Sequence, residues 1–159
     1  MKNYKYLFVC FAVIVLYGCA ASGPKYSVYS KSIAPLAADK GRIYFFRDAS
    51  FFGGGVRPDI LVNGDTVGES LPGGFFYIDK DAGSYKVSTS TEVERTVEFV
   101  LDAGETKYVR TYVTMGVMVG HVIPELVATD DATKAMTDLS YAGYYDPNKP
   151  KSETASSDL

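Results

Sequence analysis

Gly41-Arg42-Ile43-Tyr44-Phe45-Phe46-Arg47 is the stretch that decides the fold of this 159-residue chain. Its central side chains are apolar or aromatic at consecutive positions. Successive side chains of a strand point to opposite faces of the sheet, so an uninterrupted apolar run needs cover on both faces. The stretch therefore predicts a central strand with protein packed on either side.

Short β-rich runs separated by turn residues follow this strand. Asn63-Gly64-Asp65 and Asp79-Lys80-Asp81-Ala82-Gly83 are typical of tight turns, because Asn and Gly tolerate positive φ. The predicted strands are 59–62, 66–68, 75–78, 85–91, 96–101, 107–113, a segment 117–122 that pairs back on it, and 125–127. The pattern predicts a mostly β domain, an antiparallel β-sandwich or small barrel of roughly six to eight strands.

One short C-terminal helix is expected after these strands. It begins near Thr129-Asp130-Asp131, where a capping side chain and first-turn carboxylates suit a helix N-terminus. The residues expected to form its apolar face are Ala132, Ala135, Met136 and Leu139.

The first 19 residues resemble a bacterial lipoprotein signal. A short cationic start precedes an apolar run from Tyr6 to Leu16, which is shorter than the roughly 20 residues that span a hydrocarbon core. Leu16, Gly18 and Cys19 match the lipobox, with cleavage between Gly18 and Cys19. Tyr17 departs from the pattern.

The resemblance implies a diacylglycerol on the Cys19 sulfur, usually with a further acyl chain such as palmitate on the new amino terminus. Two or more chains give stable anchoring to a membrane. Ala20 in place of Asp after the cysteine implies the outer membrane, with the domain facing the periplasm. An ordinary secretory peptide, cut after Ala20 or Ala21, is the alternative and would release a soluble periplasmic domain.

These signals divide the chain into four parts. Residues 1–18 are the signal peptide, 19–40 the lipidated N-terminus and a flexible tether, 41–140 the sandwich, and 141–159 a tyrosine-rich segment with a disordered polar tail. Within the tether, Tyr26, Val28, Tyr29 and Ile33 are apolar exceptions that could dock onto the domain. Cys10 is lost with the signal and Cys19 carries lipid, so the mature chain has no disulfide and depends on packing.

Several of these segments together resemble the bacterial lipoprotein family known as domain of unknown function 2846. They are Gly41–Arg47, Val62-Asn63-Gly64 with Val67-Gly68, Ala82–Tyr85 and Ala103–Arg110, within a match over about Lys40–Leu139. The middle turns are also similar, more weakly, to PEGA and transthyretin-like envelope modules. The resemblance implies a β fold and no established activity.

Catalytic and metal-binding patterns are lacking in the sequence. His121 is the only histidine, the mature chain has no free thiol, and no Gly-x-Ser-x-Gly turn occurs, so a nucleophilic triad or a zinc site is not expected. Asp79-Lys80-Asp81 lacks the later ligands of a calcium loop. Gly53-Gly54-Gly55 leads toward a strand instead of a helix, which favours a flexible loop over a phosphate site.

Two aromatic segments are candidate contact sites for a partner or ligand: Phe51 and Phe52 before the glycine loop, and Tyr141, Tyr144 and Tyr145 near the C-terminus. For the tyrosines, folding back onto the sheet is the alternative. Arg47 and Arg110 are expected to form structural ion pairs.

The sequence predicts a cell-envelope lipoprotein with a non-catalytic binding or structural role and no cofactor. Net charge falls from −3 to −5 once Lys2 and Lys5 are removed, which gives no basic footprint for nucleic acid. The expected partners are the membrane, through the lipid, and envelope proteins, with the segment Val117–Val127 as the candidate sheet edge. The alternative is capture of a glycan or lipid in a pocket lined by Phe45, Tyr77, Tyr85 and Tyr112, and an enzyme would require His121 in a cleft beside a carboxylate.

Overall fold

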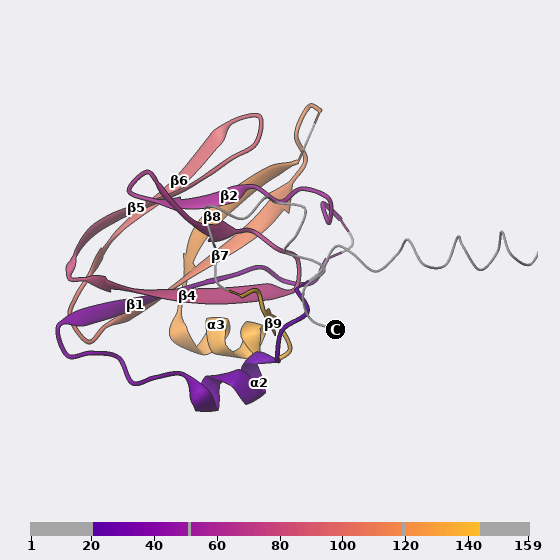
Figure 1. Ribbon diagram of the computed structural model, residues 1–159. Helices are drawn as coiled ribbons and strands as arrows, with labels where there is room; N and C mark the ends of the chain where they lie inside the picture. Colours follow the sequence, from indigo (N-terminus) through magenta and orange to yellow (C-terminus); the bar gives the residue numbers. More distant parts are fainter. Residues whose placement is uncertain (1–20, 51, 119, 144–159) are drawn as a thin grey trace, which may run out of the picture.

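The computed structural model describes residues 21–50, 52–118 and 120–143, and they form a β-sandwich (Figure 1). One sheet has the order β8-β7-β1-β4-β9 and the other β3-β2-β5-β6. The first sheet consists of β1 (Lys40–Phe46), β4 (Gly74–Asp81), β7 (Thr106–Thr114), β8 (His121–Val127) and β9 (Ser140–Tyr141). The second consists of β2 (Asp59–Val62), β3 (Asp65–Glu69), β5 (Gly83–Ser90) and β6 (Glu94–Leu101). The mostly β sandwich predicted from the sequence is confirmed, and the barrel alternative is not.

Strand β1 lies at the centre of its sheet and is buried on both faces, as its sequence predicts. Ile43 and Phe45 point into the core between the two sheets. Tyr44 and Phe46 belong to a second core on the outer face of the same sheet, which α3 (Thr129–Met136) covers. The consecutive apolar positions of β1 therefore serve two separate cores.

The pairing of β1 with β7 is parallel, which differs from the antiparallel sheet expected from the sequence. Strand β9 also pairs in parallel with β4, whereas the remaining pairs are antiparallel. Strands β2, β3, β5 and β6 lie between β1 and β7 in the chain and form the other sheet. The chain thus crosses to the second sheet and returns, and this crossover allows a parallel neighbour.

The turn at Asn63-Gly64 is confirmed. Both residues have positive φ, 52° and 93°, as a tight hairpin turn requires. Asn63 Oδ1 also accepts a 2.8 Å hydrogen bond from the Lys86 backbone N–H, which ties the turn to β5.

The prediction of strand over 117–122 is wrong for Val117, Met118 and Gly120. These residues lie in the loop between β7 and β8. Strand β8 runs without interruption over His121–Val127, so residues 121–122 and the predicted strand 125–127 belong to one strand. The side chain of Glu92 accepts hydrogen bonds from the Val117 and Met118 amides, so these amides do not pair with β7.

Helix α3 begins at Thr129, as predicted, with Ala132 and Met136 buried and Leu139 buried just beyond its end. Two details differ from the prediction. The N-cap is Ala128, which makes no side-chain capping bond, and Ala135 is exposed.

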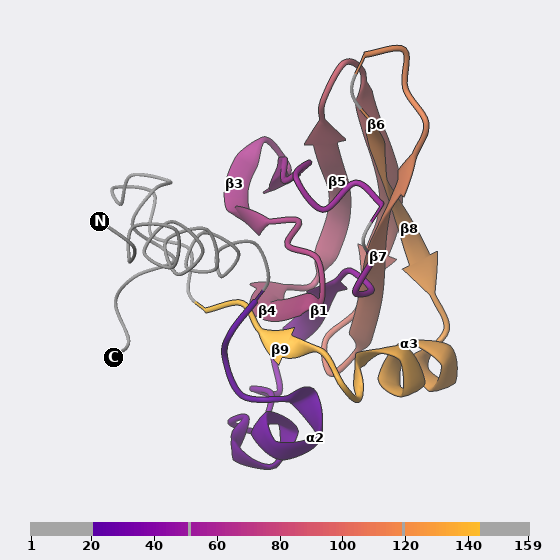
Figure 2. The same ribbon diagram turned by 90° about the vertical axis from the view of Figure 1, so that its right-hand side faces the viewer.

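Part of the expected flexible tether is folded. Residues Tyr26–Tyr29 form α2, and Ser30–Ser32 form the 3-10 helix η2. Helix α2 lies near β9 (Figure 2). Tyr26 packs edge-on against Phe75 with ring centres 5.2 Å apart, and Tyr29 and Ile33 pack on the same core. Val28, the fourth apolar exception, is exposed. Burial of these aromatic rings fixes a segment whose composition alone favours a linker.

Strand β8 lies at the edge of its sheet, in the segment expected to be available for strand addition. Two features oppose addition there. Pro124 lacks the N–H that an added strand would use, and the Val122 carbonyl already accepts a 2.7 Å hydrogen bond from Thr89 Oγ1 of the opposite sheet.

Candidate functional site

Two neighbouring loops at one end of the sandwich expose apolar side chains. In the β7–β8 loop, Met115, Val117 and Met118 are 84%, 94% and 90% exposed. In the β5–β6 turn, Val93 is 47% exposed. Exposed aliphatic side chains scattered singly are ordinary, but a group of them marks a contact surface. We call these four residues the apolar tip.

Glu92 holds the backbone of the apolar tip in place. Its carboxylate accepts hydrogen bonds from the N–H groups of Val117 at 3.2 Å and Met118 at 2.6 Å. His121 Nε2 lies 3.8 Å from the same carboxylate. The loop therefore presents its side chains while these two amides are satisfied from within the protein.

His121 is thus a strand-end residue beside a carboxylate. It opens β8, and it lies at the base of the loop that Glu92 orders. Both oxygens of Glu92 accept loop amides, which makes the pair part of the loop's support. The enzyme hypothesis requires His121 in a cleft beside a carboxylate. The carboxylate of Glu92 is nearby, but His121 lines neither of the two hollows described below.

The glycine loop after β1 lies at the same end, as its contact with β7 shows. Gly53 has a φ of 71°, and a side chain there would collide with Val113 of β7. Arg47 is buried and donates hydrogen bonds to three backbone carbonyls, those of Gly53, Val56 and Ser70. Burial lowers the pKa of its guanidinium. Arg47 therefore donates hydrogen bonds to backbone carbonyls of the loop instead of forming the expected ion pair. Arg110 forms the expected ion pairs, with Asp48 and Glu125.

The predicted contact residue Phe52 is 54% exposed in this loop. Tyr141 instead folds back: it pairs in β9 and stacks on Tyr29 with ring centres 4.3 Å apart. Phe51, Tyr144 and Tyr145, together with the predicted cleavage and lipidation residues Gly18 and Cys19, lie outside the described residues.

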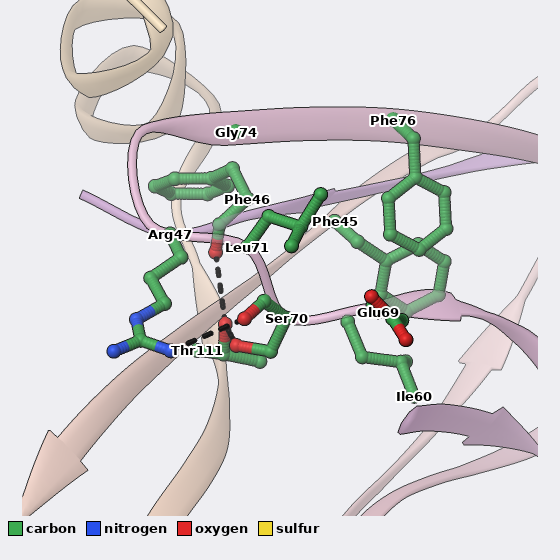
Figure 3. Close-up of a pocket in the computed structure, with 10 residues that line it drawn as sticks. All are labelled: Phe45, Phe46, Arg47, Ile60, Glu69, Ser70, Leu71, Gly74, Phe76 and Thr111. Atoms are coloured by element: carbon green, nitrogen blue, oxygen red, sulfur yellow. Dashed lines mark hydrogen bonds between the residues drawn. The ribbon is translucent and has the colours of Figure 1, made fainter. Parts of the chain in front are cut away.

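Among the described residues, the side chains between the two sheets pack into one core. The hollow beside Arg47, shown in Figure 3, is lined by Phe45, Ile60, Phe76 and neighbours and leaves no room for a water molecule. Ser70 Oγ and Thr111 Oγ1 share a 2.8 Å hydrogen bond at its floor. This hollow therefore has no space for a ligand.

The four residues of the predicted ligand pocket are not brought together. Phe45 stacks on Phe76 between the sheets, and Tyr85 packs against that core. Tyr77 lies on the opposite face of the sheet, in the outer core. Tyr112 is a half-buried residue of β7 and belongs to neither core.

That outer core is rich in tyrosine. Tyr44 stacks on Tyr108 at 5.3 Å, and the Arg42 guanidinium lies 4.5 Å from the centre of the Tyr77 ring. Burial raises the pKa of Tyr44 to about 12. Burial also raises the pKa values of Tyr26, Tyr77, Tyr108 and Tyr141. The rings pack against one another and against the buried apolar side chains of the outer core, so the cluster is a packing layer.

An open hollow of about 400 Å³ lies where the described chain begins. It is lined by Ala21, Lys25, Ala49, Ser50, Pro72, Gly73, Asp138 and Ser140. Its wall is mostly small side chains, and Lys25 Nζ is engaged by the Asp138 carbonyl at 2.6 Å. We assign it no ligand.

Over the described ranges, no group of three or more His, Cys, Asp or Glu side chains could hold a metal ion. None of the helices in these ranges is long and apolar enough to cross a membrane.

The apolar tip was not recognised from the sequence as a site. The signal is the run Met115-Gly116-Val117-Met118, followed by Gly120: glycines on both sides of an apolar segment favour a loop over a strand. The role of Glu92 has no signal in the sequence, because it acts across 25 residues of chain.

Residues 37–122 match the family described as "Protein of unknown function (DUF2846)". A Haemophilus influenzae protein (strain ATCC 51907 / DSM 11121 / KW20 / Rd), described as "Uncharacterized protein", is 31% identical over 135 residues, which are 82% of this chain and 80% of that protein. No solved structure matches the chain significantly, so the weaker likeness to PEGA and transthyretin-like modules stays a prediction. The family match and the extent of the similarity show that the chain belongs to the DUF2846 family of proteins of unknown function.

Proposed function

We propose that the protein is a cell-envelope lipoprotein with a non-catalytic binding or structural role, tethered to the outer membrane by an acylated Cys19. The observation that carries the binding role is the exposed apolar tip, together with a hollow between the sheets that has no space for a ligand. A domain arranged in this way makes contacts through its surface. The lipid anchor is supported by the lipobox residues Leu16, Gly18 and Cys19.

Intact-mass spectrometry of protein purified from bacterial membranes tests the anchor. We expect the wild-type mass to correspond to a chain that starts at Cys19 and carries acyl groups. Cys19→Ala should abolish that mass. Cys10→Ser is the matched control, because Cys10 lies in the predicted signal peptide, and it should leave the mass unchanged. An unmodified wild-type chain cut after Ala20 or Ala21 would refute the anchor.

A pull-down with the natively processed protein tests for partners among envelope proteins. The control is an unrelated domain carrying the same anchor. A protein recovered reproducibly with the full domain and not with the control would support binding to envelope proteins. Recovery of nothing beyond the control would refute it.

A further inference from the structure

The start of the described chain and the apolar tip lie at the same end of the sandwich. Phe46 at the end of β1 pairs with Phe75 at the start of β4. Strand β7 runs parallel to β1, so β7 and β1 end on the same side of their sheet, and the β7–β8 loop begins there. Ala21 lies against Gly74, the first residue of β4. In Figure 1 the start of the described chain is on the right, and the β7–β8 loop is at the top, right of centre. Figure 2, which looks at the right-hand side, shows the loop at the top and the start of the described chain lower and to the left.

We propose that this end of the sandwich rests on a lipid bilayer, with Met115, Val117 and Met118 inserted among the lipid headgroups. This inference rests on the proposed anchor at Cys19. Cys19 is two residues before Ala21, a reach of at most about 7 Å. An acylated Cys19 would hold this end of the domain close to the bilayer surface, where the apolar tip can enter it.

The chemistry of the β7–β8 loop, which carries three of the four residues of the apolar tip, suits lipid. No Lys, Arg, Asp or Glu occurs between Arg110 and Glu125, whereas Val93 lies between Glu92 and Glu94 in the β5–β6 turn. The Glu92 carboxylate accepts hydrogen bonds from the amides of Val117 and Met118. A backbone N–H without an acceptor is costly to insert into an apolar environment, and these two amides avoid that cost. The loop therefore exposes apolar side chains, and two of its amides already have an acceptor.

A bilayer fits the tip better than a protein partner does. A stable protein interface buries about 800 Å² on each side and needs a complementary shape. The apolar tip has four side chains on two narrow loops, whereas lipid adapts to a protrusion of any shape. Since the β7–β8 loop has no cationic side chain, insertion should not require anionic lipid.

The absence of tryptophan from the chain permits a direct test. Met118→Trp places one reporter on the apolar tip. Val100→Trp is the matched control, because Val100 is also exposed but lies near the end of β6, at the opposite end of the sandwich. Each full-length variant is purified from bacterial membranes and reconstituted into vesicles of phosphatidylcholine brominated on the acyl chains. The intact mass of the same sample reports whether Cys19 is acylated.

We expect the emission of Met118→Trp to shift to shorter wavelength and to be quenched about twofold, as for a side chain about 5–10 Å below the surface. Val100→Trp should show neither change. Adding Val117→Asp to the Met118→Trp chain should reduce the quenching, whereas adding Val100→Asp should not.

Equal quenching of the two reporters in a sample with acylated Cys19 would overturn the inference and leave the proposed anchor standing. A sample without acylation would refute the anchor, and quenching of Met118→Trp alone in that sample would still support lipid contact by the tip. A blue shift of Met118→Trp in native bacterial membranes that is absent in pure lipid vesicles would identify a protein as the occupant and overturn the inference.

Discussion

Arg42 on β1 and Asp79 on β4 face each other and share two hydrogen bonds, from Nε to Oδ1 at 2.7 Å and from Nη2 to Oδ2 at 2.8 Å. Arg42 also donates to the Ala34 carbonyl at 3.0 Å and covers the Tyr77 ring. The pair raises the pKa of Arg42 above its ordinary value. Arg42 thus joins the segment before β1, the neighbouring strand and the tyrosine layer.

Asp79→Asn should lower the free energy of unfolding by about 1.5–3 kcal/mol, because it removes the charged partner of a nearly buried guanidinium. Asp81→Asn is the matched control, since Asp81 pairs with Lys40 across the same two strands but at the exposed surface. It should change stability little. Urea unfolding followed by circular dichroism measures both, and equal effects would show that burial of the Arg42 pair is unimportant.

Thr89→Val should destabilise the sandwich by about 1–3 kcal/mol, because the Val122 carbonyl would lose its donor in a buried position. Thr89→Ser keeps the hydroxyl and should cost less. Denaturant unfolding provides the comparison. If serine were as destabilising as valine, the methyl packing and not the hydrogen bond would be the main contribution of Thr89.

Glu92→Ala should loosen the apolar tip without unfolding the domain. The amides of Val117 and Met118 lose their acceptor, so their hydrogen exchange should accelerate by roughly tenfold or more while exchange in β1 is unchanged. Glu98→Ala, at an exposed position of β6, serves as the control. Unchanged exchange at both amides would mean that Glu92 does not order the loop.

Tyr26→Ala should release the N-terminal segment from the sheet. Its ring packs against Phe75 and Tyr44, and loss of this packing should speed trypsin cleavage after Lys31 by about tenfold, which corresponds to about 1.4 kcal/mol of local stability. Val28→Ala in the same helix alters an exposed side chain and should have no effect. Equal cleavage rates would show that α2 is held by other contacts.

The domain should lose stability at alkaline pH. The pKa values of Tyr44, Tyr26, Tyr77, Tyr108 and Tyr141 are raised in the folded protein, chiefly by burial. The stabilising contribution is complete below the unfolded tyrosine pKa of about 10 and is lost as pH rises toward the folded values.

Above pH 10, each tyrosine that ionises only on unfolding should lower stability by about 1.4 kcal/mol per pH unit. Urea unfolding at several pH values, with tyrosinate absorbance as the second probe, measures this. Constant stability between pH 9 and about 12 would contradict the prediction.

Much of the sheet could be predicted from the sequence because strand signals are local. The consecutive apolar residues of β1 and the Asn63-Gly64 turn each specify their own geometry. The wrong strand prediction at Val117 and Met118 also comes from a local signal, because apolar β-forming residues favour a strand. Glu92, which is distant in the sequence, accepts hydrogen bonds from both amides, so they do not pair with a strand.

The sequence by itself determined the β class, the two-sided burial of β1, the position of α3 and the family resemblance, because each depends on residues close together in the chain. Only the tertiary structure decided three other features: the parallel pairing of β1 with β7, the docking of Tyr26–Tyr29, and the placing of the apolar tip at the end where the described chain begins. These depend on contacts between segments far apart in sequence, whose free energy exists only when the sandwich has formed and brings the partners together.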